Sequence, residues 1–171
     1  MLLYTLLTVL LLLIGFALWN YWPQAKLPQD AVIDRILVEK SKRELHVFQE
    51  EKLLKTYKIA LGFNPVGHKE FEGDGKTPEG IYTINDRNPN SAYFLNLGVS
   101  YPNEKDKAHA SGLGKSPGGD IKIHGFKNGT GGFGKLHRFK DWTHGCIAVT
   151  NKEMQELYEC VPNGTIIEIK P

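Results

Sequence analysis

The segment Thr143-His144-Gly145-Cys146-Ile147, with His124-Gly125 a short way upstream, decides how this chain is interpreted. It brings a thiol close to two imidazole side chains. A thiol at its ordinary pKa is mostly protonated near neutral pH, so a nucleophilic cysteine needs a base or a cationic neighbour. The glycine between His144 and Cys146 permits a sharp turn whose backbone N–H groups can form an oxyanion hole. The pattern predicts a catalytic cysteine, and the alternative is a buried packing residue.

The surrounding sequence favours catalysis. Residues 120–124 alternate between polar and apolar and predict a strand that ends at His124, and a glycine-rich loop over 125–142 leads back to the motif. This arrangement resembles the L,D-transpeptidase catalytic domain family (YkuD-like). Two further segments carry the resemblance, the Thr-Pro-Glu-Gly entry within 76–82 and the apolar stretch 97–103. The similarity covers about residues 34–171.

The resemblance implies roles for individual residues. Cys146 corresponds to the nucleophile and His124 to the general base. In relatives a main-chain carbonyl orients the base, and Gly125 offers only its backbone for this task. Gly145 is expected to give a backbone N–H to the oxyanion hole. His144 is expected to shape the loop and the oxyanion site, with His137 as a weaker rival for the base.

Two details point to one branch of the family. Asp141-Trp142 precedes the motif, and Ala148 stands where many members carry Asn or Arg. Both features resemble the YafK-like branch, which includes a hydrolase of wall cross-links. The resemblance therefore implies acyl transfer on peptidoglycan stem peptides in cell wall remodelling and cell shape, through a thioester at Cys146. The alternatives within the same fold are an L,D-carboxypeptidase and a cross-link hydrolase.

Charged residues suggest how a substrate is held. The segment 120–141 is locally basic, and Arg138 and Lys140 are candidates to bind the carboxylates of a stem peptide. The alternative is an ordinary solvated loop. Cys160, on a predicted helix, is interpreted as a packing residue. The net charge of +2 and the lack of a basic, aromatic stripe argue against nucleic-acid binding.

A binding module without catalysis is the second class of function. In it His124, His144 and Cys146 would ligate zinc. The two ligands in His-Gly-Cys are closer together than in usual structural zinc sites, and no fourth ligand is evident. We therefore expect an enzyme without metal or cofactor, and the sequence indicates no particular protein partner.

The N-terminus predicts a membrane anchor. Residues 1–19 contain nine leucines and no charged side chain, and Trp19, Tyr21 and Trp22 follow as an interfacial aromatic belt would. The prediction is a transmembrane anchor over 1–22, a linker over 23–33 and a catalytic domain over 34–171. A cleaved signal peptide is the alternative. Lys26 and Arg35 follow the span and favour the opposite orientation, but the family resemblance implies a single-pass protein of the cytoplasmic membrane whose domain faces the periplasm or cell wall.

The remaining pattern predicts a mainly β domain, sandwich-like or barrel-like, with one short helix after the cysteine. Thr150 and Glu153 form a capping-box pattern at the start of that helix. The other expectations are a hairpin over 35–48, a strand over 53–61, a loop over 62–77, a strand over 80–85, a polar turn over 85–90, an apolar stretch over 93–101, a surface loop over 102–119 and a closing strand over 165–169.

Overall fold

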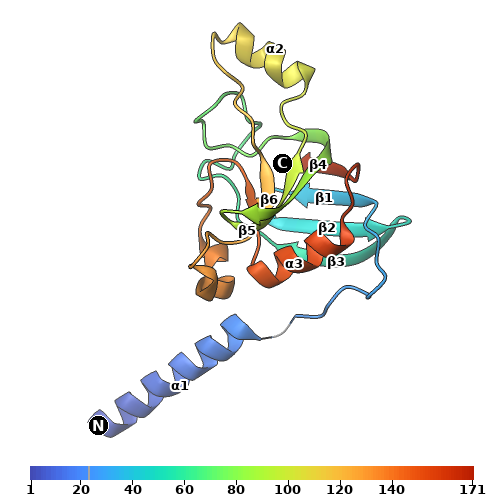
Figure 1. Ribbon diagram of the computed structural model, residues 1–171. Helices are drawn as coiled ribbons and strands as arrows, with labels where there is room; N and C mark the ends of the chain where they lie inside the picture. The colour runs from blue at the N-terminus through green and yellow to red at the C-terminus, as the bar shows by residue number, and fades with distance from the viewer. Residues whose placement is uncertain (23) are drawn as a thin grey trace.

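A computed structural model describes residues 1–22 and 24–171, so position 23 of the predicted linker lies outside the described residues (Figure 1). A long N-terminal helix projects from one end of a β-rich domain, and a short helix lies at the opposite end. The elements are α1 (Leu2–Tyr21), β1 (Arg35–Glu39), β2 (Glu44–Gln49), β3 (Lys52–Lys58), β4 (Gly80–Ser91), β5 (Phe94–Val99), α2 (Glu104–Gly112), β6 (Lys122–His124), the 3-10 helical segment η1 (Gly131–Phe139), β7 (Ile147–Ala148), α3 (Asn151–Cys160) and β8 (Ile166–Lys170).

The described strands form one continuous sheet in the order β3-β2-β1-β8-β4-β5-β6-β7. The hairpin of β1 and β2 and the closing strand β8 are confirmed, and β8 pairs in parallel with β1 and antiparallel with β4. The first part of β4, Gly80 to Thr83, pairs with β8, while its later part, from Ile84 onward and with a register shift between Ile84 and Asp86, pairs with β5. The long strand thereby joins two halves of a curved sheet, which confirms the predicted mainly β fold.

Alternation along the strands builds the core. In β1, Ile36 and Val38 are fully buried while their neighbours are half-buried, and Leu45 and Val47 repeat this pattern in β2. The helix α3 packs against β5 and β6 and adds Met154 and Leu157 to the same core. Burial of one strand face and one helix face supplies most of the driving force for such a domain.

The predicted capping box of α3 is confirmed. The Thr150 hydroxyl accepts a hydrogen bond from the Glu153 backbone N–H, and the Glu153 carboxylate accepts one from the Thr150 N–H. These bonds satisfy donors that a helix start leaves unpaired. They also fix where the chain turns after β7, directly behind the Cys146 segment.

The polar turn predicted over 85–90 is wrong. These residues continue β4, where Arg87 pairs with Leu97 and Asn88 with Asn96 of β5. The side chains of residues 85–90 are exposed on both faces of the strand, apart from the half-buried Asn88, so they are polar although the backbone is in a ladder. Because polar Asn and Asp residues are also typical of turns, composition alone gave the wrong assignment.

The surface loop predicted over 102–119 contains α2, so the expectation of a single helix in the domain is also wrong. Asn103 and Asp106 form a reciprocal capping box that starts α2. The helix buries only Asp106 and Ala110 and has no apolar stripe that could reveal it. Its stability comes from its cap and from the bond of Tyr82 to Asp106.

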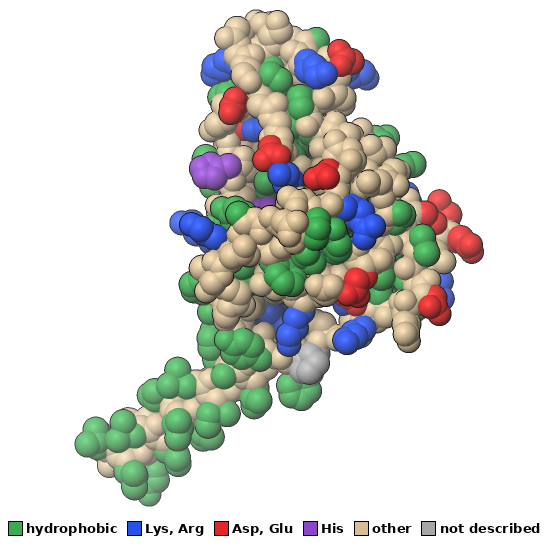
Figure 2. Space-filling model, in the orientation of Figure 1, with side chains coloured by type: hydrophobic (Ala, Val, Ile, Leu, Met, Phe, Trp, Pro, Cys, Tyr) green, Lys and Arg blue, Asp and Glu red, His purple; other side chains and the backbone are tan. Residues whose placement is uncertain are grey.

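The apolar helix α1 is long enough to cross a bilayer, and its mean hydropathy is 2.4. Its side chains are exposed except for Asn20 near its end. Figure 2 shows the apolar side chains along this helix continuing onto the domain where the two meet. A helix of this kind at the N-terminus fits either a membrane anchor or a signal sequence.

Candidate active site

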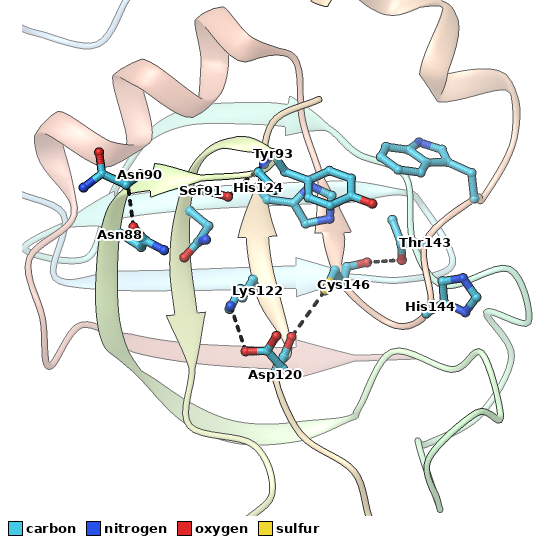
Figure 3. Close-up of a pocket in the computed structure, with 13 residues that line it drawn as sticks. Asn88, Asn90, Ser91, Tyr93, Asp120, Lys122, His124, Thr143, His144 and Cys146 are labelled. Carbon is cyan, nitrogen blue, oxygen red and sulfur yellow. Dashed lines mark hydrogen bonds and ion pairs between the residues drawn. The ribbon is translucent and has the colours of Figure 1, made fainter. Parts of the chain in front are cut away.

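Two short parallel strands bring His124 and Cys146 to the same cavity. Ile123 of β6 lies opposite Ile147 of β7, and His124 lies opposite Ala148. His124 ends β6, and Cys146 immediately precedes β7. Their side chains line one cavity of about 420 Å³ together with the labelled residues of Figure 3. The pairing of two strands that are distant in sequence therefore creates the predicted constellation.

The turn before Cys146 is held by the hydroxyl of Thr143. This hydroxyl donates to the Cys146 carbonyl at 2.7 Å and accepts the Gly145 N–H at 3.1 Å. Gly145 has φ +130°, and a Cβ at this position would lie 2.6 Å from the Lys76 carbonyl oxygen. Glycine is therefore required both by backbone conformation and by space. The motif owes its Thr and Gly to the construction of this turn.

The Gly145 N–H is already bonded to the Thr143 hydroxyl, so it is not a free donor for an oxyanion in this structure. The role predicted for it shifts toward shaping the turn. Gly125 contributes its carbonyl, which accepts a hydrogen bond from His124 Nδ1 at 2.6 Å. A carbonyl only accepts, so Nδ1 carries the proton and Nε2 is left with its lone pair. Gly125 therefore orients the imidazole through its carbonyl.

The space around Gly125 is also filled. A Cβ there would lie 2.6 Å from Asn151 Oδ1 and 3.2 Å from the Phe94 side chain. The Asn151 carboxamide accepts the Phe126 N–H at 2.8 Å. The first residue of α3 thus fixes the backbone that orients His124.

Aromatic rings enclose His124. The Tyr93 ring lies 4.8 Å from the imidazole, and the Trp142 indole lies 5.7 Å from it, edge to face. Burial lowers the pKa of His124, although the Gly125 carbonyl opposes this shift. The imidazole is therefore neutral at neutral pH.

Burial also raises the pKa of the Cys146 thiol, with a partly opposing effect from the Lys122 backbone N–H. Both groups are thus neutral before a substrate binds. The charges of Lys122 and Lys69 favour a thiolate, but burial outweighs them, and the desolvated His124 imidazole does not supply a positive charge. This arrangement fits proton transfer from sulfur to Nε2 during attack better than a preformed ion pair.

A salt bridge anchors the segment that enters the site. The Asp141 carboxylate accepts from Arg43 Nη2 at 2.7 Å and from the Leu61 N–H at 2.9 Å. Backbone bonds between Leu61 and Thr143 and between Phe63 and Thr143 continue this contact. The Asp-Trp pair of the sequence therefore serves two tasks, since Asp141 holds the loop and Trp142 packs on the imidazole.

His144 lies at the rim. Its side chain is exposed, contacts the Phe63 ring edge to face at 5.5 Å, and lines the cavity. Figure 3 shows its ring pointing away from Cys146, whereas the imidazole of His124 lies on the side of the thiol. This position suits a contact with the far part of a substrate better than proton transfer at sulfur.

The basic residues expected to bind substrate lie elsewhere. Arg138 forms a 2.6 Å ion pair with Glu153, and neither Arg138 nor Lys140 lines the cavity. The lining contains a different lysine, Lys122, paired with Asp120 at 2.7 Å. The loop folds back onto α3, and this tertiary pairing could not be read from local charge.

His137 is buried against Phe126 in a neighbouring, mostly apolar cavity of about 290 Å³. Burial lowers its pKa to about 4. In the described part of the chain neither ring nitrogen has a hydrogen-bond partner. His137 does not line the cavity of Cys146, so the geometry does not favour it as the base.

A zinc site is not favoured by the geometry. His124 Nδ1 is engaged by a carbonyl, and the described residues that gather ligand atoms within 4.8 Å of one another are Glu39, Glu44 and His46, far from the motif in sequence. The two carboxylates of that group are bound to Lys42 and Lys58. Their grouping is explained by surface ion pairs.

Sequence reasoning missed several residues of the site. Tyr93 packs on His124, and the Asn96 carboxamide oxygen is buried at the cavity without a partner in the described structure. The cavity also takes polar side chains from the end of β4, including Asn88, Asn90 and Ser91. Asn88 and Asn90 fall in the segment predicted as a turn, and Ser91 lies just beyond it. Local composition therefore did not indicate that these residues end a strand beside the site.

Known proteins share this fold. Residues 33–169 match the family model of the L,D-transpeptidase catalytic domain, YkuD. The chain belongs to this family. It is 28% identical over 137 residues to YafK of Escherichia coli strain K12, named as a candidate L,D-transpeptidase, a match that covers 77% of this chain and 48% of YafK. This relationship supports the YafK-like branch.

Two further similarities agree. The chain is 31% identical over 147 residues to YkuD of Bacillus licheniformis, also named as a candidate L,D-transpeptidase, with 83% of this chain and 68% of that protein covered. The crystal structure of the helical cell shape determining protein Pgp2 of Campylobacter jejuni superposes with a TM-score of 0.61 at 27% identity, covering 88% of this chain and 52% of Pgp2. The chain thus spans about half the length of YafK and Pgp2.

Proposed function

We propose that this protein is a cysteine-dependent acyltransferase that acts on peptidoglycan stem peptides, with Cys146 as nucleophile and His124 as general base. The observation that carries the proposal is the bond from His124 Nδ1 to the Gly125 carbonyl. It leaves Nε2 as the proton acceptor of a ring that lines the same cavity as Cys146. Membership of the L,D-transpeptidase family supplies the substrate class.

The first half-reaction makes a thioester. As Cys146 Sγ attacks a carbonyl carbon of the stem peptide, its proton passes to His124 Nε2 and the carbonyl electrons move onto oxygen. The collapsing intermediate expels an amine, a D-amino acid, which takes the proton from His124. The Cys146 backbone N–H is the donor best placed for the oxyanion, because Thr143 occupies that of Gly145. One such donor contributes about 3 kcal/mol to barrier lowering.

The second half-reaction needs an acceptor. An amine from another stem peptide gives a cross-link, and water gives hydrolysis, with His124 taking the proton of either acceptor. We propose transpeptidation as the principal outcome, with carboxypeptidase or cross-link hydrolase activity as the alternative within the same chemistry. Ala148 is fully buried and does not line the cavity. The small side chain at this position therefore does not create extra space in the cavity for an acceptor.

Substrate binding is proposed to rest on residues of the cavity itself. The unpartnered Asn96 oxygen can accept a hydrogen bond from a peptide N–H, and Lys122 can attract a stem-peptide carboxylate. Arg138 and Lys140, the candidates from the sequence, would act only at a distance.

The proposed location is the cytoplasmic membrane, with α1 as a single-pass anchor over residues 1–22 and the domain from residue 34 facing the periplasm or cell wall. The apolar helix α1 supports an anchor, and the wall polymer lies on the outer side. A role in cell shape is supported by the similarity to Pgp2.

The experiment uses full-length protein in detergent micelles with defined muropeptides, analysed by mass spectrometry. The expected products are a released D-amino acid and cross-linked or shortened stem peptides, and a mass adduct on Cys146 should be trapped with a slow substrate. The matched control is Cys146→Ala, which should yield none of them. Turnover by Cys146→Ala equal to that of the wild type would refute the mechanism.

A further inference from the structure

The end of α1 is fastened to the loop that leads into the site. Lys135 Nζ of η1 donates to the Trp19 carbonyl at 2.9 Å and to the Trp22 carbonyl at 3.1 Å. The last carbonyls of a helix lack partners within it and carry partial negative charge, so a lysine ammonium satisfies them well. Lys135 is only 7% exposed, so this contact is built into the interior of the junction.

Further contacts make the junction specific. The Asn20 side-chain oxygen accepts the Lys135 backbone N–H at 2.7 Å, and Asn20 is buried. The Tyr21 hydroxyl donates to the Gly132 carbonyl at 2.8 Å. Gly134 has φ +54°, and a Cβ there would lie 2.9 Å from the Asn20 carboxamide. The end of α1 and the η1 segment therefore form a specific packed contact, whereas a flexible linker would need no such bonds.

Apolar aromatic side chains are exposed beside this junction. Phe133 is 58% exposed and Phe139 is 72% exposed, and the Phe139 ring lies 5.8 Å from Trp19. Trp19, Tyr21 and Trp22 at the helix end are exposed as well. Single exposed apolar residues are ordinary, but here they extend the surface of a helix that is already apolar (Figure 2).

The length of α1 indicates what covers this surface. A helix of 20 residues is about 30 Å long, the thickness of the hydrocarbon core. When α1 spans a bilayer, its aromatic end lies at the lipid–water interface. The η1 segment, which is bonded to this end of the helix, then lies at the same depth. Aromatic side chains are favoured at that level.

We propose that the segment Gly131–Phe139 is a membrane-contacting element, docked on the end of α1, whose Phe133 and Phe139 side chains insert into the interfacial region of the bilayer. The occupant of the exposed surface is the lipid bilayer. The proposal rests on the membrane location given under the proposed function. Since only Lys140 separates this segment from Asp141 and Trp142, the catalytic cavity is held close to the membrane surface.

The test places a nitroxide on single cysteines of the full-length protein in phosphatidylglycerol–phosphatidylethanolamine vesicles, in a Cys146→Ala, Cys160→Ser background. Power saturation compares collisions with oxygen, which concentrates in lipid, with those of a water-soluble nickel chelate. Labels replace Phe133 and Phe139. Val66 (80% exposed) and Leu113 (48% exposed), both outside this junction, are the aqueous controls, and Leu11 within α1 is the bilayer control.

The labels at 133 and 139 should have an oxygen-to-nickel collision ratio severalfold above that of the labels at 66 and 113. Adding Lys135→Met should reduce the ratio at 139, because the junction loses its two bonds to the helix end. Aqueous ratios at 133 and 139 with a lipid-like ratio at 11 would overturn this inference alone. An aqueous ratio at 11 would overturn the anchor with it. None of these readings depends on turnover, so they stand apart from the test of the cysteine chemistry.

Discussion

The Nδ1 atom of His124 lies 2.6 Å from the carbonyl oxygen of the next residue, Gly125. This bond spans a single peptide unit, so the orientation of the imidazole is set by local backbone, which Asn151 supports from α3. A base oriented this way needs no carboxylate partner. The chemistry of the site then depends on the position of one ring and on the hydrophobic side chains around it.

His124→Ala should lower the acylation rate by about two to four orders of magnitude, the usual contribution of a positioned base. The measurement is single-turnover release of the D-amino acid at neutral pH. His144→Ala is the matched control at the cavity rim and should retain much more of the rate. A larger loss in the His144 variant than in the His124 variant would reverse the two roles.

Cys146→Ala should abolish turnover, whereas Cys160→Ala should retain it. Cys160 ends α3 and is half-buried against the core, so removing its sulfur costs about 1 kcal/mol of packing and leaves the site intact. Circular dichroism of both variants checks the fold, and the muropeptide assay checks activity. Loss of activity in folded Cys160→Ala would contradict this assignment.

The pH dependence of the alkylation rate of Cys146 should show that the Cys146 thiol and the His124 imidazole are both uncharged before a substrate binds. Burial raises the pKa of the thiol and lowers that of His124, so the thiolate fraction should keep growing beyond the ordinary thiol pKa of 9.0. The measurement is the rate of iodoacetamide modification against pH in full-length Cys160→Ala. A rate that reaches a plateau at acidic pH would instead indicate a thiolate–imidazolium pair.

Gly145→Ala should destabilise the domain by roughly 1–3 kcal/mol, because a side chain is strained at φ +130° and meets the Lys76 carbonyl. Activity should fall as well, since the turn carries Cys146. Gly112→Ala, at the end of α2 with open space around it, is the control and should be nearly neutral. Thermal unfolding in micelles measures both. Equal melting temperatures for the two variants would show that the turn tolerates a side chain.

His137 should make the domain less stable in acid. The unfolded chain protonates this histidine near pH 6.5, but the folded protein does so only near a pKa of about 4. The contribution of His137 to the free energy of unfolding is therefore present above pH 6.5 and is lost as the pH falls toward 4. The loss amounts to at most about 3 kcal/mol. In His137→Leu, the fall in melting temperature between pH 7 and pH 4.5 should be smaller than in the wild type. An unchanged fall would mean that His137 gains a partner in solution.

The site motif was accessible to sequence reasoning because its residues are constrained by local geometry. Thr143 and Gly145 build a turn that few other residues could build, and Thr150 with Glu153 caps the following helix through bonds three residues apart. The hairpin of β1 and β2 was equally predictable from alternation. The turn and the cap depend on contacts three residues apart, and the hairpin joins two strands that follow each other directly in the sequence.

The features that were missed depend on contacts between distant segments. The side chain of Arg138 is paired with Glu153 across the fold, and Asn88 joins a strand only through its partner Asn96 in β5. Similarly, the junction of Lys135 with the end of α1 joins residues more than 100 positions apart. Local composition suggested solvated loops at all three places, since charge and polarity do not reveal a distant partner.

Under the proposed membrane location, the contact between Lys135 and the final carbonyls of α1 also determines which positions the catalytic cavity can reach. A domain joined to its membrane helix by a flexible linker can take many orientations and many distances from the membrane. A domain bonded to the end of its helix instead moves together with the helix. Its cavity then stays at one distance from the membrane and in one orientation while the protein diffuses laterally. With α1 across the bilayer as proposed, the cavity then reaches only material that lies next to the membrane surface.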